Sequence, residues 1–503
     1  MSHLFEKNAA IQSATDIGEA TGPFGDDDKL HEECGVFGIF DHDDAAAFTT
    51  LGLHALQHRG QEAAGIITFN GEKFVSERHL GKVGDHFTSS KVIEKLIGRT
   101  AIGHVRYSTT GDTILQNTQP LYADLATGGF AICHNGNLTN AITLREELIK
   151  DGAICQTTSD TEVLLHLVAR SRERLFVDKF IEALKQIEGA YAFVGLTNKK
   201  LIGARDPYGI RPLVLGKQGN SYVLASETCA LNMIDAEFVR EIENGEVVII
   251  TKDGIQSYKP FGKTKSRPCI FEYIYFARPD SVVGGRCVYD VRKKMGVELA
   301  NDASVDADVV IAVPDSGVPA AIGYAQKSNI PFELGIIRNH YVGRTFIEPA
   351  QKIRELGVRL KHSANCHSIA GKRIILVDDS IVRGTTSMKI VKMMYEAGAT
   401  EVHMRISSPP ITHPDFYGID TPKRSSLIAA GRSVEEINEF IGADSLAFLS
   451  IEGIYRAMGF KERDSENPQF TDHCFTGDYP TRLLDRAGQA IDKQLSLLVE
   501  EGV

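Results

Sequence analysis

The chain has 503 residues, of which 43% are hydrophobic and 24% are charged, so it is long enough for two or three globular domains and is neither disordered nor fibrous in composition. Its 55 basic and 66 acidic side chains give a net charge of −11, which argues against a broad nucleic-acid-binding surface. No apolar run reaches the roughly 18–20 residues that a membrane helix needs, and residues 1–33 lack the apolar core of a signal peptide. We therefore expect no nucleic-acid partner, no membrane partner and no secretion.

The cysteines indicate the compartment. All eight are scattered without a short Cys-x-x-Cys spacing, so the sequence signals neither a disulfide framework nor a zinc knuckle. A reducing cytoplasm is the expected location.

The first half of the chain predicts a mixed structure of antiparallel sheet and covering helices. Short β-rich segments joined by tight turns, a spacing typical of antiparallel strands, lie at residues 191–197, 201–204, 212–215 and 222–225. Apolar residues at helical spacing predict helices at residues 45–57, 144–151, 161–171 and 177–187.

After about residue 265 strands and helices alternate, which predicts parallel strands joined by right-handed crossovers. The expected strands are residues 308–313, 372–377 and 401–407, and the expected helices are 319–327, 385–397 and 479–497. A polar segment bounded by Gly and Pro, residues 262–268, is typical of a linker between the halves.

Five residues of the first half could together form a catalytic site. Cys34 follows a polar leader and opens an apolar strand, although a lone cysteine there is often a small buried hydrophobe. Arg106 ends a strand and could equally form a surface ion pair. Asn135 and Gly136 read as a turn whose side-chain amide and backbone N–H could converge on an oxyanion. Asp160 opens a helix and could be only its N-cap.

In this order, and together with the Leu-Gln-His-Arg-Gly-Gln segment at 56–61, these residues resemble the N-terminal-nucleophile glutamine amidotransferases. The resemblance implies an αββα sandwich over residues 34–262, preceded by a propeptide, residues 1–33, whose removal makes Cys34 the first residue. It implies that Cys34 attacks the glutamine side-chain amide, with its freed α-amino group as general base or proton shuttle. By the same resemblance Asn135 and the Gly136 amide stabilise the oxyanion. Arg106 and Asp160 would hold the substrate carboxylate and ammonium.

The most specific segment of the chain is residues 373–387. An apolar strand ends in Asp378 and Asp379, and a loop rich in Ser, Gly and Thr then enters a helix. Backbone amides at a helix N-terminus, supported by hydroxyls, form a ready phosphate site, and paired aspartates suit ribose hydroxyls directly or through Mg²⁺. Two capping aspartates are the plainer interpretation, but the coincidence of strand, acid pair and hydroxyl loop favours the site.

This segment resembles the phosphoribosyl pyrophosphate motif of type I phosphoribosyltransferases, which implies a domain with a mostly parallel sheet over residues 263–485. The resemblance implies that the loop at 313–317 binds the pyrophosphate and that the basic segment 338–347 forms a lid. The implied ligands of phosphoribosyl pyrophosphate are Asp378, Asp379, Ser380, Arg383, Gly384, Thr385, Thr386 and Arg344, and those of Mg²⁺ are Ser316, Asp378 and Asp379.

A glutaminase joined to this transferase resembles the amidophosphoribosyltransferase family over residues 34–485, and residues 271–281 and 407–410 are typical of it. The resemblance implies conversion of glutamine, phosphoribosyl pyrophosphate and water to phosphoribosylamine, glutamate and pyrophosphate in de novo purine biosynthesis, with ammonia passing internally. It further implies inhibition by purine nucleotides and a homo-oligomer, a dimer or tetramer. Residues 486–503 would form a C-terminal helix or tail.

Some family members carry a [4Fe–4S] cluster on four cysteines, and here the chain departs from the pattern. Cys269 matches the first position, Asp415 stands at the second, and the paired cysteines expected just before Cys474 are absent from residues 468–471. We therefore predict no iron–sulfur cluster and a structural role for Cys269.

Two other functions remain open at this point. A different amidotransferase, such as an asparagine synthetase or a sugar-phosphate amidotransferase, would not need the acid pair and its hydroxyl loop. A non-catalytic ligand sensor built on a phosphoribosyltransferase fold would not need the complete set of Cys34, Arg106, Asn135 and Asp160.

Overall fold

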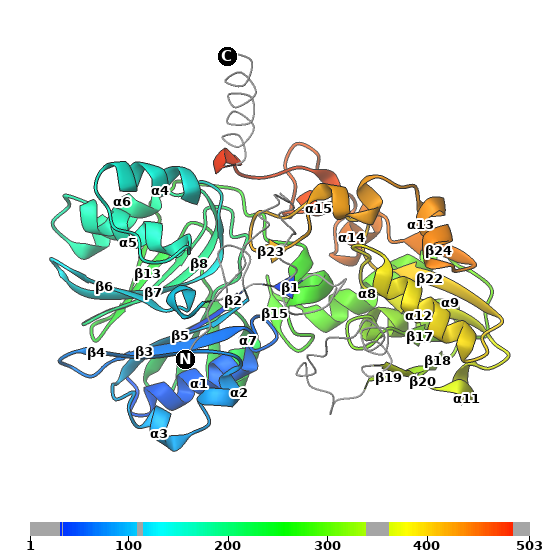
Figure 1. The fold of residues 1–503 in the computed structure, drawn as a ribbon, viewed down its shortest axis with the longest axis horizontal. Coiled ribbons are helices and arrows are strands. Elements are labelled where there is room, and N and C mark those ends of the chain that lie inside the picture. The colour runs from blue at the N-terminus through cyan, green and yellow to red at the C-terminus, as the bar shows by residue number, and fades with distance from the viewer. Residues whose placement is uncertain (1–30, 33, 108–113, 339–361, 486–503) are drawn as a thin grey trace, which may run out of the picture.

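A computed structural model describes residues 31–32, 34–107, 114–338 and 362–485 of the chain (Figure 1). Most of the expected propeptide, nearly all of the expected lid with Arg344, and the expected C-terminal tail lie outside these ranges.

Two antiparallel sheets form the first half. The strands of the seven-stranded sheet, in spatial order, are β12 (Glu237–Glu241), β10 (Val214–Gln218), β11 (Ser221–Ala225), β2 (Cys34–Phe40), β5 (Thr100–Arg106), β3 (Ala63–Phe69) and β4 (Phe74–Leu80). Those of the six-stranded sheet are β14 (Gly254–Tyr258), β13 (Val247–Thr251), β9 (Leu201–Arg205), β8 (Gly189–Thr197), β7 (Gly128–Leu138) and β6 (Leu121–Leu125).

The two sheets pack face to face and helices cover their outer faces (Figure 1). In β2, Val36 packs toward the second sheet while Phe37 and Ile39 pack toward the helices, as the period of two in a strand requires. The helices beside the first sheet are α1 (Ala45–Ala55), α2 (Val83–His86), α3 (Ser90–Ile93) and α7 (Thr228–Met233), and those beside the second are α4 (Ala141–Lys150), α5 (Thr161–Arg170) and α6 (Phe176–Leu184). The αββα sandwich is confirmed.

A parallel sheet forms the core of the second half. Its strands, in spatial order, are β18 (Phe332–Glu333), β17 (Val309–Ala312), β21 (Arg373–Asp378), β22 (Glu401–Ile406) and β24 (Ser445–Phe448). One face is covered by α8 (Val288–Asp302), α9 (Val318–Ser328) and α14 (Ile451–Ala457), and the other by α12 (Thr385–Glu396) and α13 (Val434–Ile441). A Cβ at Gly296 of α8 would lie 1.9 Å from the Ala320 carbonyl oxygen of α9, so these two helices touch through their backbones. The predicted parallel sheet is confirmed.

Short elements connect these layers. They are the strand pairs β1 (His31–Glu32) with β23 (Ile419–Asp420), β15 (Val282–Val283) with β16 (Arg286–Cys287), and β19 (Ile336–Arg338) with β20 (His362–Ala364), and the short helices η1 (Leu115–Asn117), η2 (Glu272–Phe276), α11 (Cys366–Ile369), η3 (Arg424–Ser426), η4 (Ile428–Ala430) and α15 (His473–Thr476). Residues 262–268 carry no helix or strand, as expected of a linker. Among the described helices, none has both the length and the apolar character needed to cross a membrane.

Two predicted elements start at least two residues later than expected. The strand expected from residue 212 begins at Val214, because Pro212 has no N–H to donate to a ladder. The helix expected from residue 479 is not formed over 479–483. There Tyr479 Oη donates to the Pro414 carbonyl at 2.7 Å, and the Thr481 N–H donates to Tyr417 Oη at 3.1 Å. These contacts hold the segment in a non-helical form.

Candidate active sites

Cys34 and Arg106 lie directly opposite each other in the first sheet. Cys34 is the first residue of β2, Arg106 is the last of β5, and the antiparallel register pairs them. Both are buried. A Cβ at Gly60 would lie 2.6 Å from the Arg106 backbone nitrogen, so only glycine lets this segment pass the strand end. The structure thus brings a thiol and a guanidinium group to one edge of the sheet.

Asn135 and Gly136 lie within β7 and pair with β8, so the expectation that they form a turn is wrong. Gly136 has a φ of 137°, a conformation that favours glycine, and a Cβ there would lie 2.1 Å from the Ala190 carbonyl oxygen. Glycine is therefore required at this position of the strand. The Asn135 Nδ2 atom is 3.5 Å from Ser226 Oγ, which also accepts the Val36 N–H at 2.9 Å. Ser226 therefore links Asn135 to the strand that begins with Cys34.

Asp160 is at the N-cap of α5, but its side chain makes no capping hydrogen bond. Its Oδ2 atom accepts the Leu138 N–H at 3.0 Å and lies 3.5 Å from His134 Nδ1, and its Oδ1 atom accepts from the Thr161 hydroxyl at 3.2 Å. Burial alone raises the pKa of Asp160, but His134 and these hydrogen bonds lower it more, so the net pKa is below the ordinary value. The group is an ionised carboxylate suited to an ammonium ligand.

Two buried histidines beneath this site are not assigned any role by the sequence analysis. His104 Nε2 lies 3.0 Å from the His134 carbonyl oxygen, and the His134 N–H donates to Gln119 Oε1 at 2.8 Å. Burial lowers the pKa of His104 to about 3, so its imidazole is neutral and can donate to the carbonyl. His134 is adjacent to Asn135 in sequence, and that adjacency is the one signal that could have singled it out.

Asp378 and Asp379 lie at the carboxyl end of β21 and are both buried. The Asp379 N–H donates to Asp378 Oδ1 at 2.9 Å, and the Ser380 hydroxyl donates to Asp379 Oδ2 at 2.6 Å. The two carboxylates are thus fixed at the edge where the loop to α12 begins, the edge at which open parallel sheets bind ligands.

The loop that follows is shaped for an anion. Gly384 is the N-cap of α12 with a φ of 82°, a conformation that favours glycine. Thr385 and Thr386 begin the helix, and Thr385 Oγ1 is buried with no hydrogen-bond partner among the described residues. Arg383 lines a pocket of about 480 Å³ that Arg424 and Arg432 also line. N–H groups, hydroxyls and guanidinium groups therefore surround this end of the sheet.

The loop after β17 reaches the same place. The Val313 N–H donates to the Val377 carbonyl at 2.9 Å, and a Cβ at Gly317 would lie 2.5 Å from that oxygen. Ser316 Oγ is buried and has no partner within the described part of the chain. A Cβ at the adjacent Gly317 would lie 3.3 Å from the Asp378 Cα, so this loop passes the start of the acid pair. An orphaned hydroxyl and two carboxylates are ligand types that fit Mg²⁺, which prefers oxygen. Of the individual ligand residues predicted from sequence in this half, only Arg344 lies outside the described residues, together with nearly all of the predicted lid.

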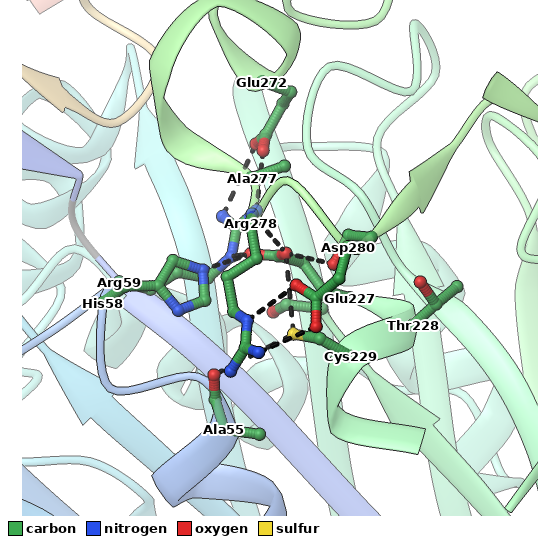
Figure 2. Close-up of polar contacts among 12 residues, drawn as sticks. Ala55, His58, Arg59, Glu227, Thr228, Cys229, Glu272, Ala277, Arg278 and Asp280 are labelled. Atoms are coloured by element: carbon green, nitrogen blue, oxygen red, sulfur yellow. Dashed lines mark hydrogen bonds and ion pairs between the residues drawn. The ribbon is translucent and has the colours of Figure 1, made fainter. Parts of the chain in front are cut away.

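A buried network of ionic groups joins the two halves of the chain (Figure 2). Arg59 donates from Nε to Glu227 and from Nη2 to Glu272 Oε2 at 2.6 Å. Glu227 also accepts from the Ser281 hydroxyl at 2.6 Å and lies 2.6 Å from His58 Nε2. Burial raises the pKa of Glu227, but Arg59 and His58 lower it more, so the net pKa is well below the ordinary value and the group is a carboxylate. The sequence marks two segments that contain most of these residues, 56–61 and 271–281, as typical of the family, but it predicts no role for any of the residues and does not mark Glu227.

Cys269 and Asp415, two positions compared with a four-cysteine cluster, are buried, and so is Cys474, which follows the segment where the paired cysteines are absent. Asp415 Oδ1 accepts the N–H groups of Tyr417 and Ile419 at 2.7 and 2.8 Å. A four-cysteine cluster would lack cysteine ligands here, because Asp415 stands at one of its positions and the paired cysteines before Cys474 are absent. The absence of a [4Fe–4S] cluster stays a prediction. The structural role expected for Cys269 stays a prediction.

Known proteins match both halves. The chain matches the glutamine amidotransferase domain family over residues 104–233 and the phosphoribosyl transferase domain family over residues 288–407. It is 61% identical over 483 residues to an amidophosphoribosyltransferase of Rhizobium etli, covering 95% of this chain and 97% of the relative. It is 51% identical over 455 residues to that of Bacillus subtilis, covering 90% of this chain and 95% of the relative.

Solved structures agree. The chain is similar to a glutamine phosphoribosylpyrophosphate amidotransferase from B. subtilis in complex with ADP and GMP, with a TM-score of 0.85 and 50% identity over 90% of this chain and 98% of that one. A second structure, described as the allosteric regulatory enzyme of purine biosynthesis, gives a TM-score of 0.86 at 50% identity, over 90% of this chain and 97% of that one.

Proposed function

The chain belongs to the amidophosphoribosyltransferase family, and from this membership we propose which of its residues carry each part of the reaction. The chain transfers nitrogen from glutamine to phosphoribosyl pyrophosphate in de novo purine biosynthesis, which excludes the alternative amidotransferases and the sensor. The observation that carries the assignment of the glutamine site is the register that sets Cys34 opposite Arg106.

In the first half-reaction Cys34 is the nucleophile. Its thiolate attacks the side-chain amide carbon of glutamine, the C–N bond breaks to release ammonia, and water hydrolyses the thioester to glutamate and the free thiol. Asn135 Nδ2 and the Gly136 N–H donate to the oxyanion; the 3.5 Å separation from Ser226 leaves the Asn135 amide able to turn toward it. Arg106 binds the substrate carboxylate, and Asp160 binds its ammonium group.

Removal of residues 1–33 is part of this proposal. Until the bond to Glu33 is broken, Cys34 has no free amine that could act as general base. We propose residues 34–262 as the glutaminase domain and 263–485 as the transferase domain, a division supported by the two family matches, which fall one on each side of it.

In the second half-reaction ammonia attacks C1 of phosphoribosyl pyrophosphate and pyrophosphate leaves from the opposite face. Asp378 and Asp379 hold the ribose hydroxyls, and Ser380, Arg383, Gly384, Thr385 and Thr386 hold the 5-phosphate with N–H, hydroxyl and guanidinium donors. Mg²⁺, held by Ser316, Asp378 and Asp379, supplies positive charge to the leaving group when bound. Arg344 is proposed as a further contact to this substrate.

Purine nucleotides are proposed as inhibitors, since a relative of known structure is a complex with ADP and GMP and a pocket with three arginines lies beside the loop that enters α12. We propose a dimer or tetramer as the assembled form. A cytoplasmic location is supported by the eight cysteines, none of which forms a disulfide.

The test is pyrophosphate release from phosphoribosyl pyrophosphate and Mg²⁺, with glutamine or ammonium as nitrogen source, and the intact mass of the same sample. Release with both sources and a mass that lacks residues 1–33 would support both sites and the processing step. Release with ammonium alone on an uncleaved chain would retain the transferase assignment and show that Cys34 was not mature. Glutamine-dependent release by an uncleaved chain would contradict the role given to the α-amino group.

A further inference from the structure

A segment of the transferase half lies against the part of β7 that carries Asn135 and Gly136. This segment, residues 415–420, follows β22 in the chain and ends in β23. A Cβ at Gly418 would lie 3.0 Å from the Gly136 Cα, so the two halves touch here through backbone atoms. Gly418 has a φ of 115°, a conformation that favours glycine. The contact therefore needs glycine on the transferase side as well as in β7.

Two side chains of the glutaminase half bind consecutive carbonyl groups of this segment. Asn137 Nδ2 donates to the Phe416 carbonyl at 3.0 Å, and Arg211 Nε donates to the Tyr417 carbonyl at 2.9 Å. Arg211 is fully buried, and Asn137 directly follows Gly136 in β7. The segment is therefore bound to the glutaminase half immediately beside Gly136.

The segment is also fixed by its own side chains. Asp415 Oδ1 accepts the N–H groups of Tyr417 and Ile419 on either side of Gly418, and the Asp415 N–H donates to Thr421 Oγ1 at 2.6 Å. The Asp415 side chain is buried, so these bonds are shielded from water. The turn around Gly418 is thus closed on itself and presents a fixed surface to β7.

Gly136 packs against the backbone of two different elements. A Cβ at Gly136 would lie 2.1 Å from the Ala190 carbonyl oxygen in β8, while Gly418 of the transferase segment touches its Cα. Donors that are already in place when the oxyanion forms stabilise it best. A displacement of about 1 Å at a catalytic site can cost about 100-fold in rate. The contact with Gly418 can therefore affect the rate of the glutaminase step.

We propose that Gly418 is a positioning residue for the glutaminase reaction, because the transferase segment 415–420 holds Gly136 where its N–H meets the oxyanion. This inference rests on the role proposed above for Asn135 and Gly136. It means that the glutamine site is complete only when the transferase half is folded against it.

The test measures the formation of glutamate as well as the release of pyrophosphate by the full chain. In Gly418→Ala the added Cβ would lie 2.9 Å from Arg211 Nη2 and 3.0 Å from the Gly136 Cα, so the segment or the strand must shift. We expect kcat for glutamate formation to fall about 10- to 100-fold. The KM for glutamine should change little, because the oxyanion forms only after glutamine has bound. Ammonium-dependent release of pyrophosphate should be kept.

Gly254→Ala is the matched control. Gly254 also has a φ of 115°, but no described atom lies within 4 Å of the position of its Cβ. The control therefore introduces the same backbone strain without a collision, and glutamate formation should stay unchanged. Equal kcat for glutamate formation in folded Gly418→Ala and Gly254→Ala would overturn the proposal. Loss of ammonium-dependent turnover in Gly418→Ala would overturn it too, and so would normal glutamate formation with loss of only glutamine-dependent pyrophosphate release, which would assign Gly418 to ammonia transfer.

Two further variants keep the test decisive. Asn137→Ala removes the bond to Phe416 and should lower kcat for glutamate formation several-fold, which decides the matter if circular dichroism and gel filtration show that Gly418→Ala is not folded. Asn135→Ala separates this inference from the proposed function. If Asn135→Ala leaves glutamate formation unchanged, the proposed oxyanion site is wrong. If it lowers glutamate formation while folded Gly418→Ala and Asn137→Ala do not, only the positioning role is wrong.

Discussion

Arg59 Nη2 lies 2.6 Å from Glu272 Oε2, and this contact connects the two halves of the chain through groups that are fully buried. Arg59 follows α1 and is next to Gly60, which touches the Arg106 backbone, while Glu272 begins η2 beyond the linker. The same guanidinium also binds Glu227. Arg59 therefore links the segment beside the Arg106 strand end to the transferase half through buried ion pairs.

Replacing Arg59 should destabilise the protein strongly. Arg59→Gln leaves two buried carboxylates, Glu227 and Glu272, without their shared cation, and breaking a buried ion pair from one side costs about 3–5 kcal/mol. Arg99→Gln is the matched control, because Arg99 pairs with Asp41 at an exposed site, where a pair contributes about 1 kcal/mol or less. Urea unfolding of both variants measures the difference. Equal losses of unfolding free energy would show that the buried network does not hold the halves together.

Removing the nucleophile should separate the two activities. In Cys34→Ala we expect no glutamine-dependent release of pyrophosphate and full release with ammonium, since only the glutamine site has lost its reacting atom. Cys155→Ala, at a partly buried cysteine of the same half, should keep both activities. Simultaneous loss of both activities in a folded Cys34→Ala protein would contradict the division into two sites.

Removing the proposed oxyanion donor Asn135 should slow the glutaminase step. Asn135→Ala should lower glutamine-dependent kcat by about 100- to 1,000-fold, the usual effect of removing one such donor, and leave ammonium-dependent turnover intact. Asn198→Ala, at an exposed turn between β8 and β9, serves as the control. A loss expressed only as a higher KM for glutamine would assign Asn135 to substrate binding instead.

How far the sequence predicts this site depends on how local each signal is. The strand, acid pair and glycine loop around Asp378 and Gly384 are contiguous, so their apolar run, carboxylates and hydroxyls predict the structure directly. Asn135 and Gly136 have the composition of a turn, and only the Ala190 carbonyl against Gly136 reveals that they belong inside a strand.

Contacts between distant segments could not be predicted in the same way. Arg59 meets Glu227 and Glu272 across 168 and 213 residues. No local pattern marks Glu227, and the family-typical segment that contains Glu272 does not indicate its partner. His473 and Cys474 meet Asp415 only because the chain folds back beside β22. Their spacing in sequence does not indicate that juxtaposition; only the comparison with the cluster of some family members brings Asp415 and the segment before Cys474 together, and it does not mark His473.

Replacing one aspartate of the acid pair should lower turnover with both nitrogen sources. Asp379→Asn removes a charge from the proposed ribose and Mg²⁺ site, so turnover with glutamine and with ammonium should fall together, with a higher KM for phosphoribosyl pyrophosphate. Asp306→Asn removes an exposed carboxylate that pairs with Arg373 at the other end of the same strand, and should change neither. Normal ammonium-dependent kinetics in Asp379→Asn would remove this residue from the transferase site.

The buried histidine below the glutamine site should make stability depend on pH. Burial lowers the folded-state pKa of His104 to about 3, whereas an exposed histidine has a pKa near 6.5. Between these values the unfolded chain binds the extra proton, so the free energy of unfolding rises with pH across this window and levels off above about 6.5. The stability that depends on neutral His104 is lost as pH falls from about 6.5 toward about 3, and the loss between pH 7 and pH 5 should be about 2 kcal/mol. Urea unfolding at both pH values should show this difference in unfolding free energy in the unmodified chain and a smaller difference in His104→Gln. In His54→Gln, whose side chain is exposed, the difference should be as large as in the unmodified chain. The same pH dependence in His104→Gln as in the unmodified chain would show that another group is responsible.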